Sequence, residues 1–206
     1  MKNTLKYYLA GYNLVAFLFG AAYLLYFIAS GLRLDPFGVI LLDIAQGLAL
    51  LEIIHAIFKW VKSPVLSTAA QVASRILVVV LINKLPVFGS ITWDITAGHG
   101  YSFMLLLGVI VVSFAWGITE LVRYSLYFLS LVDLQPRWLL WARYSFFIVL
   151  YPCGVTGEWL IILSPIVALH FPLNAYSIFA IFLFGSYAYY FPVLYGYMWK
   201  QRKVKL

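Results

Sequence analysis

The sequence predicts an all-α integral membrane protein: a single bundle of six transmembrane helices with both termini in the cytoplasm. Three observations predict this fold class. The 206 residues are 65% hydrophobic and only 10% charged, whereas a soluble domain is usually about 45–50% apolar and about 25% charged. Six apolar segments are long enough, or nearly so, to cross a bilayer, and most basic residues lie on one side of them. The length suits one domain, residues 1–206.

The six segments follow one another with short links. A helix needs about 20 residues to cross ~30 Å of hydrocarbon at ~1.5 Å per residue, and only the third segment is short. No segment alternates with the period of two that a β-barrel strand requires. The predicted helices are Tyr7–Ser30, Gly38–Val61, Val65–Ile82, Tyr101–Tyr127, Trp138–Leu169 and Asn174–Trp199.

The first segment imitates a secretory signal, because Lys2 and Lys6 precede a long apolar run. A signal core is about 7–15 residues long, whereas Tyr7–Ser30 has 24 residues. We therefore expect a retained first helix. The later segments are separated by turn-forming residues: Gly31, Asp35 and Pro36; Ser63 and Pro64; Pro86, Gly89, Gly98 and Gly100; Asp133 and Pro136; Pro172 and Asn174.

The lysines and arginines predict the orientation. With six spans the termini share a side, and that side holds 11 of the 14 basic residues. The other side holds two, Arg33 and Lys84, and Arg75 lies within the third segment. Basic residues are enriched in cytoplasmic loops. The net charge of +7 is thus mainly a topology signal, and we expect no nucleic-acid partner. Attraction of a phosphate-bearing cytosolic ligand is a second role open to it.

Polar side chains form one stripe on each of four segments. Residues three, four or seven apart project from nearly one face of a helix, and ionisable groups in hydrocarbon are candidate functional groups. The alternative is structural: the acids Glu52 and Glu120 pair with arginines and hold the bundle together. The stripes are Glu52, His55 and Lys59; Thr68, Gln71 and Arg75; Ser113, Trp116, Glu120, Arg123 and Tyr127; and Tyr144, Tyr151 and Glu158.

The fifth segment is too long for a straight span. Trp138–Leu169 would extend about 48 Å, against ~30 Å of hydrocarbon. We expect the helix to break at Pro152, Gly154 and Gly157, because proline removes a backbone donor and glycine tolerates unusual dihedrals. Broken helices at membrane depth line protein-enclosed cavities.

Tyr151 and Glu158 flank the expected break, well below the membrane surface. A carboxyl group taken out of water holds its proton more tightly, which suits proton transfer near neutral pH. A tyrosine hydroxyl can donate a proton to a leaving oxygen. The pair suits elimination or isomerisation of a lipid-like substrate. A glutamate that is bonded to a neighbour for structural reasons explains the pattern equally well.

Several classes of site are excluded. The histidines His55, His99 and His170 have no paired spacing, so we expect no metal site. Cys153 is the only cysteine, which rules out an intrachain disulfide. Trp159 stands where a cysteine-phosphatase loop needs an arginine. There is no glycine-rich nucleotide loop.

The stretch YPCGVTGE, residues 151–158, resembles the Tyr-Pro-x-Gly-Val-x-x-Glu signature of a known family. The family is that of the very-long-chain (3R)-3-hydroxyacyl-CoA dehydratases, also called protein tyrosine phosphatase-like. Three other segments of this sequence resemble segments of the same family: LEIIHAIFKWVKSPVLSTAAQVASR, WGITELVRYSLYF and RYSFFIVLYP. The resemblance covers roughly residues 45–160, and the segments together are more specific than the motif alone.

The resemblance implies the third step of fatty-acid elongation in the endoplasmic reticulum membrane. Water leaves a very-long-chain 3-hydroxyacyl-CoA to give a trans-2-enoyl-CoA, with Tyr151 and Glu158 as the catalytic pair. Our hypothesis makes Glu158 the base at C2 and Tyr151 the acid at the departing hydroxyl; the opposite assignment is open. We expect no cofactor, because the thioester itself delocalises charge. The implied partners are the acyl-CoA, membrane lipids and other elongation enzymes.

Further residues are candidates for substrate contacts. Gln71 or Arg75 is a candidate donor to the thioester oxygen. Tyr144 shares the stripe of the catalytic pair, and Phe147 is a candidate for the wall around the acyl chain. Four basic residues are candidates for the CoA phosphates, although the positive-inside bias explains them equally well: Lys59, Lys62, Arg137 and Arg143.

Two other functions are open. A small membrane transporter would use the buried acids as a proton relay or a binding site, although no internal repeat is visible. A noncatalytic lipid-binding scaffold for elongation enzymes would carry the same fold. Formation of an enoyl product separates an enzyme from both, and uptake into proteoliposomes identifies a transporter.

Overall fold

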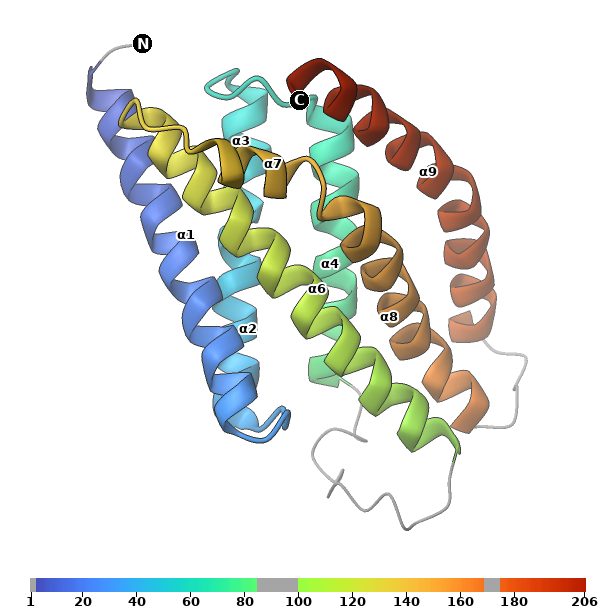
Figure 1. The fold of residues 1–206 in the computed structure, drawn as a ribbon. Helices are drawn as coiled ribbons and strands as arrows, with labels where there is room; N and C mark the ends of the chain where they lie inside the picture. Colours follow the sequence, from blue (N-terminus) through green and yellow to red (C-terminus); the bar gives the residue numbers. More distant parts are fainter. Residues whose placement is uncertain (1–2, 85–99, 169–174) are drawn as a thin grey trace.

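The computed structural model describes residues 3–84, 100–168 and 175–206, which fold into an all-helical bundle (Figure 1). Within these ranges, six helical segments are long and apolar enough to span a membrane, as predicted. The helices are α1 (Asn3–Ala29), α2 (Pro36–Leu48), α3 (Leu50–Ile57), α4 (Val65–Lys84), α6 (Gly100–Leu131), α7 (Arg137–Arg143), α8 (Phe147–Ala168) and α9 (Ala175–Lys205). The links predicted within 85–99 and 169–174 lie outside the described residues.

Two of the six spans consist of two helices each. α2 and α3 meet at Ala49, whose backbone stays helical (φ −63°, ψ −20°), and together they form the span Pro36–Ile57. α7 and α8 form the span Arg137–Val167 and are separated by a turn at residues 144–146.

The predicted position of the break in the fifth segment is wrong. The chain turns at residues 144–146, and α8 then runs without interruption through Pro152, Gly154 and Gly157. A proline leaves the carbonyl four residues earlier without its helical donor. For Pro152 that carbonyl belongs to Ile148, and the Tyr195 hydroxyl of α9 donates to it at 3.2 Å. This replacement partner removes one cost of the proline, so the helix continues.

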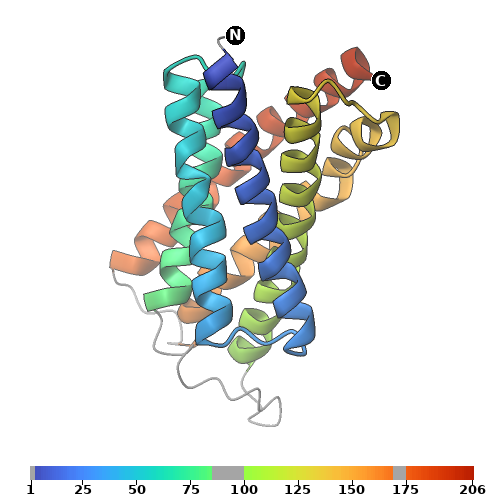
Figure 2. The ribbon, with the colours of Figure 1, turned by 90° about the vertical axis from the view of Figure 1, so that its left-hand side faces the viewer.

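α6 lies between α1 and α8 and packs along both (Figures 1 and 2). It approaches α8 closely where two glycines face the partner helix. A Cβ added to Gly108 would lie 2.9 Å from Ile161 Cγ1, and one added to Gly157 would lie 2.7 Å from Val112 Cγ2. Small residues let membrane helices approach in this way, so Gly157 serves close packing rather than a kink.

The largest apolar core lies among α1, α2, α4, α6 and α8, with one residue from α9. It excludes lipid from the centre of the bundle, and it holds Trp116 in place next to the site described below. Its buried members include Tyr23, Phe27, Leu42, Val78, Leu105, Val109, Val112, Trp116, Ile161 and Ala180.

A tight turn joins α1 to α2. Gly31 adopts φ 72°, a left-handed conformation that glycine reaches without strain. Asp35 then caps α2, accepting hydrogen bonds from the Gly38 amide at 2.7 Å and from the Tyr26 hydroxyl at 2.5 Å. These hydrogen bonds, that of Tyr26 first, lower the pKa of the Asp35 carboxyl below its ordinary value.

The start of α1 and the end of α9 lie at the same end of the bundle (Figure 1). An even number of spans requires this arrangement. α9 crosses behind the other helices at a steep tilt (Figure 2) and packs mainly against α8. Its buried residues, Ser177 and Ala180, lie near its start, where the Tyr176 hydroxyl also donates to the Ile162 carbonyl of α8 at 2.8 Å.

Candidate active site

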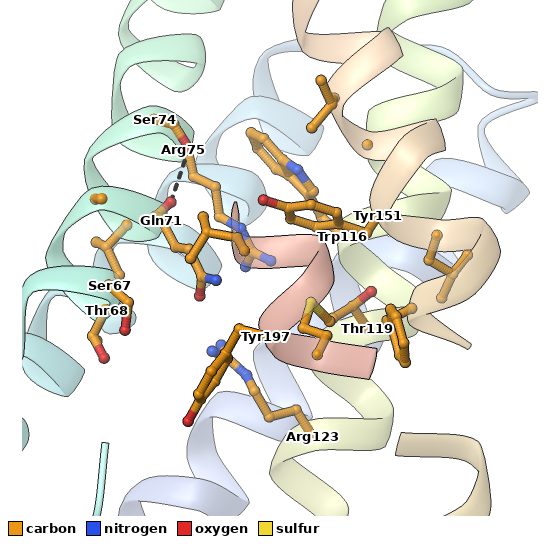
Figure 3. Close-up of a pocket in the computed structure, with 18 of the residues that line it drawn as sticks. Ser67, Thr68, Gln71, Ser74, Arg75, Trp116, Thr119, Arg123, Tyr151 and Tyr197 are labelled. Carbon is orange, nitrogen blue, oxygen red and sulfur yellow. Dashed lines mark hydrogen bonds between the residues drawn. The ribbon is translucent and has the colours of Figure 1, made fainter. Parts of the chain in front are cut away.

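A cavity of about 580 Å³ lies between α4, α6, α8 and α9. Polar side chains of α4, from Ser67 to Arg75, lie along one side of it (Figure 3). Aromatic and apolar side chains of α8 and α9 form much of the opposite wall. The arrangement offers a polar surface and an apolar surface to the same ligand, inside the membrane-spanning part of the protein.

Tyr151 and Glu158 both line this cavity. They stand seven residues apart on the uninterrupted α8, so they project from nearly the same face. Glu158 is buried, with only 6% of its surface exposed. Both side chains therefore line one cavity, and an uninterrupted helix rather than a broken one brings them there.

The carboxyl group of Glu158 is hydrogen-bonded at both oxygens. The indole Nε1 of Trp116, on α6, donates to Oε1 at 3.1 Å. The hydroxyl of Tyr187, on α9, donates to Oε2. Two helices besides its own thus determine where this carboxyl group points.

The ring of Tyr151 is stacked on aromatic rings of α9. Its centroid lies 5.1 Å from that of Phe191 and 6.2 Å from that of Tyr195, with the planes nearly parallel. In Figure 3 the ring extends from α8 into the cavity, and its hydroxyl points towards α4, where Arg75 lies. The hydroxyl makes no hydrogen bond with any described residue, so it is available to a ligand.

Arg75 forms an ion pair with Glu120 behind the cavity wall. Its Nη1 lies 2.7 Å from Glu120 Oε1, to which Gln46 also donates at 2.8 Å. The Arg75 guanidinium lies over the ring of Trp116, 5.5 Å from its centroid. Apart from the bond to Glu120, the Arg75 N–H groups have no hydrogen-bond partner among the described residues.

Arg123 forms a second, partly buried ion pair, with Glu52. Its Nη1 and Nη2 lie 2.9 Å and 2.7 Å from the two carboxylate oxygens of Glu52. The hydroxyl of Tyr124 also donates to Glu52, at 2.5 Å. The structural alternative, in which the acids within the spans pair with arginines, is therefore confirmed for Glu52 and Glu120. It does not apply to Glu158, whose partners are a tyrosine and a tryptophan.

The eight substrate-contact candidates all belong to the described ranges, and the structure separates them into two groups. Two of them, Lys59 and Arg137, are exposed and do not line the cavity. The other six line it: Lys62, Gln71, Arg75, Arg143, Tyr144 and Phe147. Arg143 ends α7, and Lys62 lies in the link between α3 and α4; α7 and this link lie towards the end of the bundle that carries the termini (Figure 1).

Sequence reasoning missed Tyr187 and did not single out Trp116 as a partner of Glu158. A signal for Tyr187 was present in α9, where residues spaced by three and four line the cavity as one face. These are Tyr187, Tyr190, Leu194, Tyr197 and Gln201. The spacing marks the face, but it does not say which helix that face meets.

Comparison of the sequence with known protein families shows to which family the chain belongs. Residues 46–206 match the family described as protein tyrosine phosphatase-like protein, PTPLA. The chain belongs to this family. The matched range contains Tyr151, Glu158, Trp116 and Tyr187, so the resemblance drawn from the YPCGVTGE motif is confirmed.

Curated relatives within the PTPLA family carry the name very-long-chain (3R)-3-hydroxyacyl-CoA dehydratase. The chain is 36% identical over 172 residues to dehydratase 1 of Ovis aries, covering 77% of this chain and 54% of that protein. It is 38% identical over 177 residues to dehydratase hpo-8 of Caenorhabditis elegans, covering 79% and 74%. It is 37% identical over 171 residues to dehydratase 2 of Homo sapiens, covering 75% and 61%.

The chain thus spans about half to two thirds of the length of several of these relatives. No solved structure was found to match it.

Proposed function

We propose that this chain dehydrates very-long-chain (3R)-3-hydroxyacyl-CoA to trans-2-enoyl-CoA, as a single catalytic domain within the membrane. The observation that carries the proposal is the presence of Tyr151 and Glu158 in one cavity. One supplies a hydroxyl without a partner among the described residues, and the other supplies a carboxyl group with fixed orientation. The names of the PTPLA relatives support the choice of reaction.

Glu158 acts as the base and Tyr151 as the acid. Glu158 takes the proton from C2, and the electrons of that C–H bond form the C2–C3 double bond as the C3–O bond breaks. Tyr151 gives its phenolic proton to the departing hydroxyl, which leaves as water. Passage of the proton from Glu158 to the Tyr151 oxygen restores both groups. The Cα atoms of the pair are about 10 Å apart along α8, which leaves room for C2 and C3 between the two side chains.

The negative charge that develops on the thioester oxygen needs hydrogen-bond donors. Gln71 and Arg75, one turn apart on α4, line the cavity on the side towards which the Tyr151 hydroxyl points. The Gln71 amide and the spare N–H groups of Arg75 have no hydrogen-bond partner among the described residues. These two side chains are the donors we assign to the thioester.

We assign the CoA phosphates to the basic residues at the end of the cavity nearest the termini, which we call its mouth. The aromatic wall takes the start of the acyl chain. Lys62 and Arg143 line the cavity towards the end with the termini, and Tyr144 and Phe147 lie next to Arg143 along the chain. Guanidinium and ammonium groups are effective phosphate ligands. Lys59 and Arg137, outside the lining, have no role in this proposal.

The orientation and location follow from the charge distribution and from the reaction. We place both termini in the cytoplasm, because the side they share holds 11 of 14 basic residues. This orientation turns the cavity mouth towards cytosolic acyl-CoA. The endoplasmic reticulum membrane and association with other elongation enzymes are the setting we propose for such an activity.

The test is a product assay on the purified chain in lipid nanodiscs. We expect trans-2-enoyl-CoA from (3R)-3-hydroxyacyl-CoA of very long chain length, measured by mass spectrometry, and little product from the (3S) isomer. Absence of enoyl product at every chain length would contradict the proposal. Uptake of a labelled lipid into proteoliposomes without product formation would favour the transporter instead.

A further inference from the structure

Glu158 is the only member of the proposed catalytic pair that other side chains hold by hydrogen bonds among the described residues. We infer that Tyr187, acting with Trp116, is a positioning residue for the dehydration: the two donors fix the Glu158 carboxylate in the orientation that removes the C2 proton. The inference rests on the proposed function and adds a residue from α9, a helix without either catalytic group.

The two donors constrain the carboxylate in complementary ways. A glutamate side chain has several rotatable bonds, and a base placed an ångström away from its target loses much of its rate. Trp116 holds Oε1 from α6, and Tyr187 holds Oε2 from α9. With both oxygens bound, rotation of the carboxylate plane breaks at least one hydrogen bond. One donor alone would leave that rotation free.

The two donors also differ in their chemistry. An indole N–H can only donate, whereas a phenol can donate and accept. Trp116 is therefore a fixed anchor that takes no part in proton movement. Tyr187 can donate to the Glu158 carboxylate and accept from the carboxylic acid, so this hydrogen bond can persist after Glu158 has taken the C2 proton.

Both donors are themselves supported. The Arg75 guanidinium lies 5.5 Å from the Trp116 ring centroid, and Arg75 is held by Glu120. The ring of Tyr187 meets that of Trp159 edge to face at 6.2 Å between centroids. Because α9 packs mainly against α8, the Tyr187–Glu158 bond also connects a sparsely packed helix to the catalytic carboxylate. The test must therefore distinguish positioning of the Glu158 carboxylate from a purely structural role of that bond.

The test compares Tyr187→Phe with Tyr189→Phe in the dehydration assay. The first variant removes only the hydroxyl that donates to Glu158. The second makes the same change on the same helix, at an exposed side chain outside the cavity lining. A hydrogen bond to a charged group accounts for about tenfold to 100-fold in rate. We expect kcat to fall by about that factor in Tyr187→Phe, with KM within about twofold of wild type and Tyr189→Phe unchanged.

A double variant tests whether Tyr187 acts through Glu158. Glu158→Asp withdraws the carboxylate by one methylene from the Tyr187 hydroxyl, so the hydrogen bond is already lost. Adding Tyr187→Phe to Glu158→Asp should then lower kcat by less than about twofold, because coupled residues are not additive. An equal loss in both backgrounds would overturn the inference.

A conservative replacement covers the case in which Tyr187→Phe does not fold. Tyr187→His keeps a ring donor at this position, and we expect it to retain kcat within about tenfold of wild type by restoring the hydrogen bond. A folded Tyr187→His variant with kcat more than about tenfold below wild type would contradict the inference.

Other outcomes are equally decisive. Lower thermal stability with unchanged kcat would make the bond structural, and a raised KM with unchanged kcat would make Tyr187 a substrate contact; either overturns the inference. Wild type and Glu158→Gln are measured alongside. If wild type makes enoyl product while Tyr187→Phe keeps its kcat, only the inference fails. If wild type makes none, the proposed function fails and the inference falls with it.

Discussion

Gly157 of α8 lies against Val112 of α6 so closely that a single added carbon does not fit. A Cβ at residue 157 would lie 2.7 Å from Val112 Cγ2 and 3.0 Å from the carbonyl oxygen of Gly108 and the amide of Val112. Glu158 follows directly, and Trp116 lies one turn beyond Val112 on α6. The close approach of the two helices brings the Trp116 indole within hydrogen-bonding distance of Glu158.

Gly157→Ala should destabilise the protein by about 1–3 kcal/mol, the usual cost of overpacking a tight interior. Two of the three atoms that the new Cβ meets belong to the backbone, so α6 and α8 must separate. The matched control is Gly11→Ala in α1, where a Cβ meets no atom within 4 Å. Unfolding by SDS titration in mixed micelles measures both. Equal stability of the two variants would contradict the proposed close packing.

Arg123→Met should lower the free energy of unfolding by about 3 kcal/mol, the lower end for a buried pair, because it leaves the partly buried Glu52 carboxylate without its charge partner. The comparison variant is Lys6→Met, which breaks an ion pair with Asp133 whose side chains are 38% and 87% exposed. Exposed pairs contribute about 0–1 kcal/mol. The same SDS titration measures both changes, and a cost for Lys6→Met as large as that for Arg123→Met would count against a buried network.

The cap of α2 should make stability depend on acid pH. Hydrogen bonds from Tyr26 and Gly38 lower the pKa of Asp35, so the ionised carboxyl stabilises the folded state. This contribution is complete above the ordinary carboxyl pKa of about 3.9 and is lost as the pH falls through the lower folded-state value. The melting temperature of wild type should therefore be higher than that of Asp35→Asn at neutral pH, and the difference should disappear in strong acid. A difference in melting temperature that grew as the pH fell would contradict the stabilising role assigned to the ionised Asp35 carboxyl.

Replacement of the basic residues at the cavity mouth should raise KM for the acyl-CoA. We expect Lys62→Gln with Arg143→Gln to raise KM about tenfold or more with kcat little changed, since each phosphate contact contributes about 1 kcal/mol or more. Added salt should raise the wild-type KM in the same direction. Arg137→Gln is the comparison, because Arg137 does not line the cavity. An equal KM increase in Arg137→Gln would move the CoA site away from the mouth.

The spans could be predicted because hydrophobic length belongs to each segment alone. The helix predicted at Val65–Ile82 is α4, Val65–Lys84. The break predicted at Pro152 was wrong because the outcome depends on Tyr195, which lies 43 residues later and replaces the missing donor. A local pattern cannot show that a distant hydroxyl will satisfy a freed carbonyl.

The residues of the candidate site, too, could be predicted from the sequence only in part. Tyr151 and Glu158 share a helix, so their spacing alone brought them to one face. The partners of Glu158 come from α6 and α9, and only the packing of three helices brings them together. The charge stripes likewise predicted that buried acids meet arginines. They did not decide that Arg75 pairs with Glu120, because either arginine satisfies either acid.

The most direct test of the account is single-turnover dehydration by Tyr151→Phe and Glu158→Gln, with thermal melting as a check of folding. Loss of a positioned acid or base costs about 10²- to 10⁴-fold in rate. We therefore predict that each variant forms trans-2-enoyl-CoA at least about 100-fold more slowly than wild type, while Tyr189→Phe keeps the wild-type rate. A folded Tyr151→Phe or Glu158→Gln variant whose rate stays within about tenfold of wild type would contradict the account.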